Sequence, residues 1–217
     1  MKGKSKETLI RDIAPEEIEA ESFRIIAEEL GRTDFDPATF KVVQRVIHAT
    51  GDFSFAENML FHPRAISAGI EAIRAGRNIL TDVNMAASGV SRGLLSKWGG
   101  RVICRVGEPE VAAIAREKGA TRSGVAIEMG LGENIGIVAV GNAPTALLKV
   151  MECMENMTES ERPGLVVGVP VGFVNAAESK DLLAVKSYPF ITSLGRKGGS
   201  PVAAAIVNAL IRLTLEK

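Results

Sequence analysis

The stretch IGIVAVGNAPTALLKVMECMEN (135–156) indicates the class of fold, because it passes from an apolar strand pattern to a helix pattern within a few residues. Its first seven residues are apolar and rich in Ile and Val, as in strands that are buried on both faces. A short turn, GNAP, follows, and the remainder has the composition of a helix. This strand–turn–helix unit is typical of a parallel sheet that is covered by helices.

Four more apolar segments repeat the pattern. They are NILTDV (78–83), RVICRV (101–106), LVVGVP (165–170) and FITSLG (190–195). Helices are predicted between and after the segments, at residues 108–119, 121–130, 143–156, 175–184 and 198–215. The alternation predicts an α/β fold with three layers (α/β/α), in which a mostly parallel, five-stranded sheet lies between two layers of helices.

Extra helices are predicted at the N-terminus, before the first of these strands. APEEIEAESFRIIAEEL (14–30) has Pro15 at a position favoured at helix starts, and DPATFKVVQRVIHATG (36–51) has Asp36 as its N-cap. A third helix is predicted from Pro63 to Gly76. Because the chain shows no linker and no internal repeat, we expect a single domain over residues 1–217, with residues 1–10 as a flexible N-terminal extension.

The composition argues against several classes of protein. The 217 residues include 26 basic and 26 acidic side chains, so no net charge favours nucleic acid or an anionic membrane as a partner. The apolar runs are too short to span a membrane, and the N-terminus lacks the apolar core of a secretory signal. The two cysteines form no metal-binding pattern. We therefore expect a cytoplasmic protein without a metal site.

Ligands of parallel sheets gather outside the carboxyl ends of the strands. The loops expected at that edge are rich in Gly, Pro, Asn and Ser, and read DVNMAASGVSR (82–92), VGNAPTA (140–146), VPVGFVNAAESK (169–180) and LGRKGGSP (194–201). Small residues and backbone N–H groups in such loops can face a bound molecule. We expect the binding site to be built from these loops.

Individual motifs in these loops and at nearby helix starts fit both a structural and a functional role. LGRKGGSP fits either a loop that binds phosphate or carboxylate groups or a surface turn. It does not match the GxxxxGK(S/T) motif of nucleotide hydrolases, because its lysine precedes the glycine pair. No G-x-G-x-x-G fingerprint of dinucleotide binding follows any strand. Thr121 and Arg122 fit a capping turn with an exposed arginine. Glu178 and Lys180 fit the solvated face of a helix start.

The segment VVQRVIHATGD (42–52) contains His48, one of two histidines. His48 lies at the predicted C-terminal end of a helix, where the helix dipole favours a protonated imidazole. A histidine in this position more often caps or packs than catalyses, so spacing leaves both roles open. Asp52 is a candidate to orient the ring. His62, before Pro63, fits a turn residue.

Six segments together resemble the precorrin-8X methylmutase family, also known as precorrin isomerases or cobalt-precorrin-8 methylmutases. The resemblance covers nearly the whole chain, and its GNAPTAL and PVGFVNAAESK motifs are long and distinctive. The segments are VIHATGDF (46–53), AGRNILTDVNMAASGVSR (75–92), GATRSG (119–124), VGNAPTALLK (140–149), VGVPVGFVNAAESK (167–180) and GRKGGSPVAAAIVNAL (195–210).

The resemblance implies an isomerase that uses no cofactor and acts as a homodimer with active sites near the subunit interface. Its reaction moves a methyl group from C-11 to C-12 of precorrin-8X or cobalt-precorrin-8 by a 1,5-sigmatropic shift, giving hydrogenobyrinic or cobyrinic acid. The resemblance places the family's catalytic histidine on His48. It places ligand-lining positions on Ser22, Ser91 and Arg122, with Arg122 a candidate to reach across the dimer.

The substrate of that family, a large flat ring with carboxylate arms, indicates further binding residues. Arg196 and Lys197 are candidates, with Arg122, to pair with the carboxylates. Asn84 and Met85 are also predicted to bind the substrate, and Val171 and Phe173 to contact the ring. Two alternatives stay open: a non-catalytic tetrapyrrole carrier of the same pathway, and a nucleotide-binding protein that uses GRKGGS.

Overall fold

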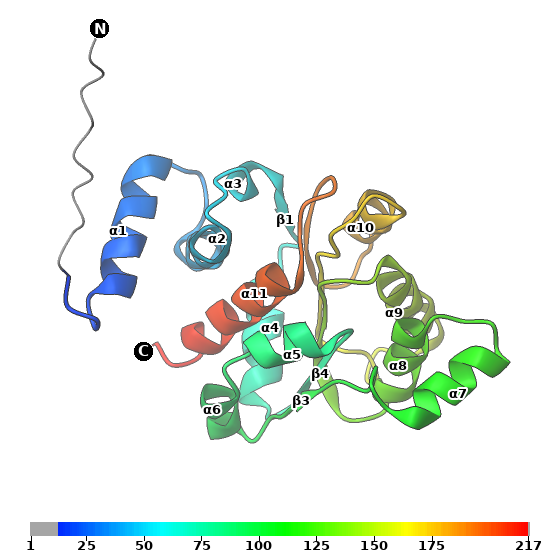
Figure 1. The fold of residues 1–217 in the computed structure, drawn as a ribbon. Coiled ribbons are helices and arrows are strands. Elements are labelled where there is room, and N and C mark those ends of the chain that lie inside the picture. The colour runs from blue at the N-terminus through cyan, green and yellow to red at the C-terminus, as the bar shows by residue number, and fades with distance from the viewer. Residues whose placement is uncertain (1–12, 217) are drawn as a thin grey trace, which may run out of the picture.

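The computed structural model describes residues 13–216 of the chain, so the predicted extension at residues 1–10 lies outside the described residues (Figure 1). Its centre is a sheet with the strand order β1-β6-β5-β4-β2-β3, in which all neighbours are parallel except β1 and β6. The strands are β1 (Met59–Phe61), β2 (Asn78–Thr81), β3 (Val102–Ile103), β4 (Ile135–Val140), β5 (Leu165–Gly168) and β6 (Phe190–Ser193). The predicted mostly parallel sheet is confirmed.

The predicted number of five strands is wrong, because β1 adds a sixth. This strand has three residues and pairs antiparallel with the edge of β6, where Leu60 lies opposite Thr192. Its partner is more than 130 residues away along the chain, and three residues are too few to show a period of two. Nothing local in the sequence therefore distinguishes β1 from a loop.

Helices cover both faces of the sheet, as the three-layer prediction requires (Figure 1). Ile79 and Leu80 are adjacent in β2 but belong to different apolar cores, one on each side. The first core packs against α1 (Ile18–Leu30), α2 (Pro37–Thr50), α3 (Phe55–Asn58), α4 (Ala65–Arg74), α5 (Asn84–Gly89), α6 (Arg92–Leu95), the 3-10 helix η1 (Ser96–Trp98) and α11 (Ser200–Leu213). The other layer contains α7 (Pro109–Glu117), α8 (Arg122–Gly130), α9 (Pro144–Asn156) and α10 (Ala176–Ala184).

The start and end of α2 follow the sequence signals. The Asp36 carboxylate accepts hydrogen bonds from the N–H groups of Ala38 and Thr39, at 3.0 and 3.1 Å. Gly51 ends the helix with φ of 64°, a conformation that glycine adopts without strain. His62 is confirmed as a turn residue, because its Nδ1 accepts a hydrogen bond from the N–H of Arg64.

Two local predictions are wrong. Pro15 does not open a helix: α1 begins at Ile18, and residues 15–17 form a turn. The loop expected at residues 82–92 contains the helix α5, which is too short for a visible helical period.

Among residues 13–216, no helix combines the length and the apolar character that crossing a membrane requires.

The strand order creates a switch point between β2 and β4. These strands are neighbours in the sheet, but from β2 the chain proceeds to β3 on one side and from β4 to β5 and β6 on the other. Open α/β sheets commonly bind their ligands outside the carboxyl ends of the strands at such a switch point.

Candidate active site

His48 lines a pocket between three helices of one layer. It lies in the last turn of α2, is exposed, and faces a cavity of about 250 Å³. Its imidazole meets the ring of Phe23 edge-on, with ring centres 5.2 Å apart. The pocket is lined by Arg45, His48, Ala49, Gly89, Pro201, Ala204, Ala205 and Asn208. The structure thus places His48 as a pocket residue rather than as a residue of the core.

The wall opposite His48 is made of small residues on α11 and α5. A Cβ atom at Gly89 would lie 2.7 Å from the Cβ of Ala204, so only glycine lets the two helices approach this closely. Asn208 ties the same elements together. Its amide nitrogen donates to the carbonyl of Gly89, and its amide oxygen accepts from the N–H of Ser91, both at 2.8 Å. Ser91 is therefore fixed against α11 beside the pocket.

Sequence reasoning missed Asn208. A polar residue in the otherwise apolar run PVAAAIVNAL is a signal that could have identified it, because a polar side chain on a packed helix needs hydrogen-bond partners.

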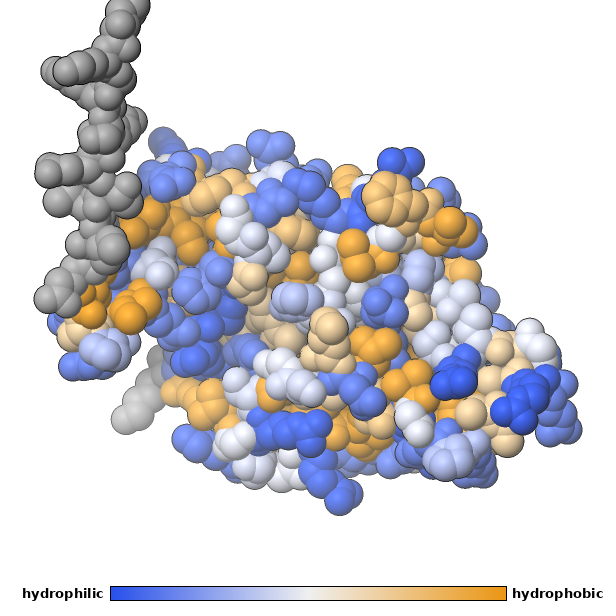
Figure 2. Space-filling view, in the orientation of Figure 1, coloured by the Kyte–Doolittle hydropathy of each residue, from blue (hydrophilic) through white to orange (hydrophobic). Residues whose placement is uncertain are grey.

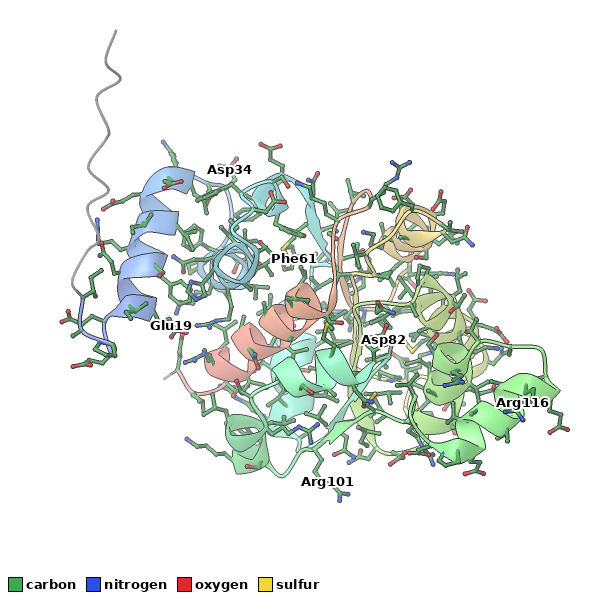
Figure 3. The ribbon with its side chains drawn as sticks, viewed as in Figure 1. Glu19, Asp34, Phe61, Asp82, Arg101 and Arg116 are labelled. Carbon is green, nitrogen blue, oxygen red and sulfur yellow. The ribbon has the colours of Figure 1, made fainter. Side chains whose placement is uncertain are left out.

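Helix α1 closes the other side of His48. The guanidinium of Arg45 lies 4.8 Å from the centre of the Phe23 ring and donates to Glu19 at 3.0 Å. That hydrogen bond is the main reason why the pKa of Glu19 is lowered. Figure 3 shows Glu19 on the side of α1 that faces the body of the protein. Ser22 precedes Phe23 on this helix, and its hydroxyl donates to the carbonyl of Ile18 at 2.8 Å.

The loop after β6 reaches the end of α2. The ammonium of Lys197 lies 2.6 Å from an oxygen of Asp52 and 2.9 Å from the hydroxyl of Ser54. The Lys197 contact, followed by hydrogen bonds from Ser54, lowers the pKa of Asp52 to about 2. The expectation that Asp52 orients His48 is therefore replaced by a different role. Asp52 joins the C-terminal end of α2 to the LGRKGGSP loop.

Arg196 and several apolar side chains that were predicted to bind the substrate are exposed outside the His48 pocket. The guanidinium of Arg196 lies 5.3 Å from the centre of the Phe173 ring, and Phe173 is 83% exposed. Met85 is 71% exposed and, with the exposed Asn84, opens α5 at the carboxyl end of β2. Hydrophobic side chains also show at the surface near α10 in Figure 2. Other exposed apolar residues of the loops before α10 and after β6 are Val171, Val174 and Leu194.

Arg122 lies in the other layer of helices. It is exposed at the start of α8, where the predicted cap is confirmed: the Thr121 hydroxyl oxygen accepts from the N–H of Gly124 at 3.2 Å. That hydroxyl also donates to Thr145 on α9 at 3.0 Å. Because His48 belongs to the layer of α2 and α11, the fold of the single chain does not bring Arg122 and His48 together.

Asp82 is a buried residue of the switch point that sequence reasoning missed. It follows β2, is completely buried, and accepts hydrogen bonds from the N–H groups of Gly141, Asn142 and Ala143 at 2.8–3.0 Å. Burial raises the pKa of its carboxyl group, and the three donors oppose that rise. Figure 3 shows Asp82 near the centre of the molecule.

The Asp82 contacts occupy the N–H groups that precede α9, which would otherwise be suitable donors to a phosphate. The GRKGGS loop of the nucleotide alternative is a different loop, which follows β6. An acidic residue directly after a buried strand, with a Gly-Asn turn after the neighbouring strand, was the signal available in the sequence.

The sequence profile of the precorrin-8X methylmutase family matches residues 17–213. The chain belongs to the precorrin-8X methylmutase family. It is 44% identical over 200 residues to a cobalt-precorrin-8 methylmutase of Priestia megaterium, which covers 91% of this chain and 88% of the relative. It is 43% identical over 193 residues to a precorrin-8X methylmutase of Pseudomonas aeruginosa, which covers 88% of this chain and 91% of the relative.

A solved structure agrees with this placement. The crystal structure of a precorrin-8X methylmutase from Thermus thermophilus is similar with a TM-score of 0.83 and 42% sequence identity, over 92% of this chain and 98% of that one. The resemblance seen in the sequence is therefore confirmed. The protein is a methylmutase, an isomerase of cobalamin biosynthesis that shifts a methyl group within a tetrapyrrole.

The prediction that Lys180 lies on the solvated face of a helix is wrong. Lys180 is completely buried, and its ammonium donates to the carbonyl of Lys197 at 2.6 Å. Burial lowers its pKa to about 8. The loop that covers Lys180 comes from residues near 197, so the pattern around α10 alone could not reveal the burial.

Proposed function

We propose that this methylmutase moves the methyl group of its substrate from C-11 to C-12 by a 1,5-sigmatropic shift, with His48 as the proton donor. The carbon–carbon bond at C-11 breaks as the bond at C-12 forms, so substrate and product are isomers. The position of His48 on the pocket between α2, α5 and α11 carries the proposal.

A sigmatropic shift needs no protein nucleophile and no hydride carrier, but it responds to the electron distribution of the ring. A donor fixed against the ring favours the product's distribution, and it acts most strongly where water is excluded. His48 has apolar neighbours in its pocket: the Phe23 ring meets its imidazole edge-on, and Ala204 and Ala205 line the same pocket.

The other predicted residues fit roles in binding. A cavity of about 250 Å³ takes only one edge of a tetrapyrrole, so the rest of the ring must lie outside it. We propose that Met85, Val171 and Phe173 contact the ring. We propose that Arg196 and Lys197 pair with its carboxylate arms, and that Ser22, Ser91 and Asn84 complete the polar contacts.

We further propose a homodimer with active sites shared between subunits. Two observations support it. Arg122 lies in the layer opposite His48, and exposed apolar side chains occur on the 171–174 loop, on α10 (Leu182) and directly after it (Val185). In this proposal, each subunit is one domain spanning residues 1–217, works in the cytoplasm, and supplies Arg122 to its partner's ring.

Mixing two inactive variants tests the shared site. His48→Ala and Arg122→Ala should each lose activity as pure proteins. Subunit exchange at equal amounts should restore about one quarter of the wild-type sites, because half of the dimers are mixed and each mixed dimer has one intact site. Turnover by the exchanged mixture, against each variant alone, is the measurement. A mixture as inactive as its parts would contradict a site shared between subunits.

Incubation with the metal-free and the cobalt-containing substrate tests the reaction and its route. Relatives of similar identity carry both names, so similarity does not choose between the two. We expect the absorption spectrum to change on incubation, without any added cofactor, and the faster substrate to identify the route. Tight binding of both rings with unchanged spectra would instead support the carrier alternative.

A further inference from the structure

The buried ammonium of Lys180 is a feature that the proposed reaction does not use. Lys180 is completely buried, and within residues 13–216 the structure gives its ammonium one hydrogen-bond acceptor, the carbonyl of Lys197. An ammonium can donate three hydrogen bonds, and burying it is costly even when it is paired. A methionine of similar length would fill the space without that cost. Packing alone therefore does not explain a lysine here.

The carbonyl that Lys180 holds lies at the centre of a clamped loop. The hydroxyl of Ser193 donates to the same Lys197 carbonyl at 3.1 Å. On either side, the N–H of Gly172 donates to the carbonyl of Arg196 at 3.2 Å, and the N–H of Gly199 donates to the carbonyl of Val169 at 2.8 Å. These contacts fix the backbone from which the side chains of Arg196 and Lys197 project.

The same loop grips the helix that carries His48. The Lys197 ammonium binds Asp52 and Ser54, which follow the end of α2. Asp52 is four residues beyond His48, directly after the helix-ending Gly51. A continuous series of contacts thus runs from Lys180, through Lys197 and Asp52, to the C-terminal end of α2.

We propose that Lys180 is a positioning residue, which holds the Lys197 carbonyl so that the Lys197–Asp52 ion pair keeps the His48 end of α2 in place. This inference rests on the proposed function, because the placement of α2 affects turnover through His48, the proposed proton donor. Lys180 acts through the loop and does not touch the ring.

Lys180→Met tests the inference. We expect the variant to fold, since the change removes a buried charge without removing volume. Its kcat should fall about ten-fold, because the defect is in the placement of a catalytic group, while KM should rise by a smaller factor, because Arg196 and Lys197 project from the same loop. Lys186→Met is the matched control: Lys186 follows the same helix and pairs with Glu155 at 2.6 Å, outside the loop. It should retain wild-type kcat.

A double-mutant cycle separates positioning from general destabilisation. Lys180→Met and Asp52→Asn break the same series of contacts, so the double variant should lose little more than the larger single loss. Losses that multiply, or a Lys180→Met variant with normal kcat, would overturn the inference. Lys180→Gln keeps a donor without the charge and should recover part of the loss; if Lys180→Met does not fold, Lys180→Gln takes its place in the cycle.

Hydrogen exchange gives a readout that does not depend on turnover. In Lys180→Met, the amides of Gly199 and Ser54 should exchange faster than in the wild type, because both are bonded within the clamped region. The amide of His62, bonded to Phe190, serves as the internal reference. If the wild-type protein does not convert the substrate, the proposed function fails; if exchange at Gly199 and Ser54 is unchanged, the inference fails by itself.

Discussion

His48→Ala is expected to lower turnover by about a thousand-fold, the usual contribution of a positioned acid or base. The loss should fall on kcat, because the proton donor acts on the ring after it has bound. Stability should change little, since His48 is exposed at a helix end and its ring contacts Phe23 only edge-on. The variant should therefore fold and still bind the tetrapyrrole.

Single-turnover kinetics with saturating substrate measure this loss directly. His62→Ala is the matched control, because His62 is the other histidine and serves a turn by bonding the N–H of Arg64. It should turn over like the wild type. A His48→Ala variant within two-fold of the wild-type rate would show that the proton comes from elsewhere.

Asp82→Ala is expected to lower the free energy of unfolding by about 3 kcal/mol, because it removes a charged acceptor and leaves N–H groups of the switch point without a partner. The Gly141 N–H is buried and bears most of the loss, whereas water can reach Asn142. The loops after β2 and β4 should then separate, and turnover should fall as well.

Urea unfolding measures the change, from the midpoint and its slope. Asp82→Asn is the comparison that isolates the charge: it keeps one acceptor oxygen and should cost about half as much. If Asp82→Ala unfolds at the wild-type urea concentration, the carboxylate does not hold the switch point together.

Much of the fold was predictable because its signals are local. The five parallel strands are continuous apolar runs, and Asp36 and Gly51 mark the start and end of α2. Local signals did not place the end of α2, which carries His48, beside the loop after β6, because these two segments are distant in the sequence. The family resemblance predicted a catalytic role for His48, whereas spacing alone left its role open.

The contacts that organise the site were not predictable, because each joins distant segments. Lys197 and Asp52 are 145 positions apart, and Asp82 and Gly141 are 59 apart. Lys180 has the local pattern of a solvated lysine, and only the covering loop makes it buried. The burial and the contacts of such residues depend on tertiary packing between distant segments, which a short stretch of sequence does not reveal.

Following a labelled methyl group tests whether the protein catalyses the proposed shift from C-11 to C-12. Substrate that carries ¹³C in the methyl group at C-11 would be incubated with the purified protein and examined by NMR. We expect the label to move to C-12 in a product of unchanged mass, without an added cofactor. A ring that binds to the protein while its label stays at C-11 would contradict it.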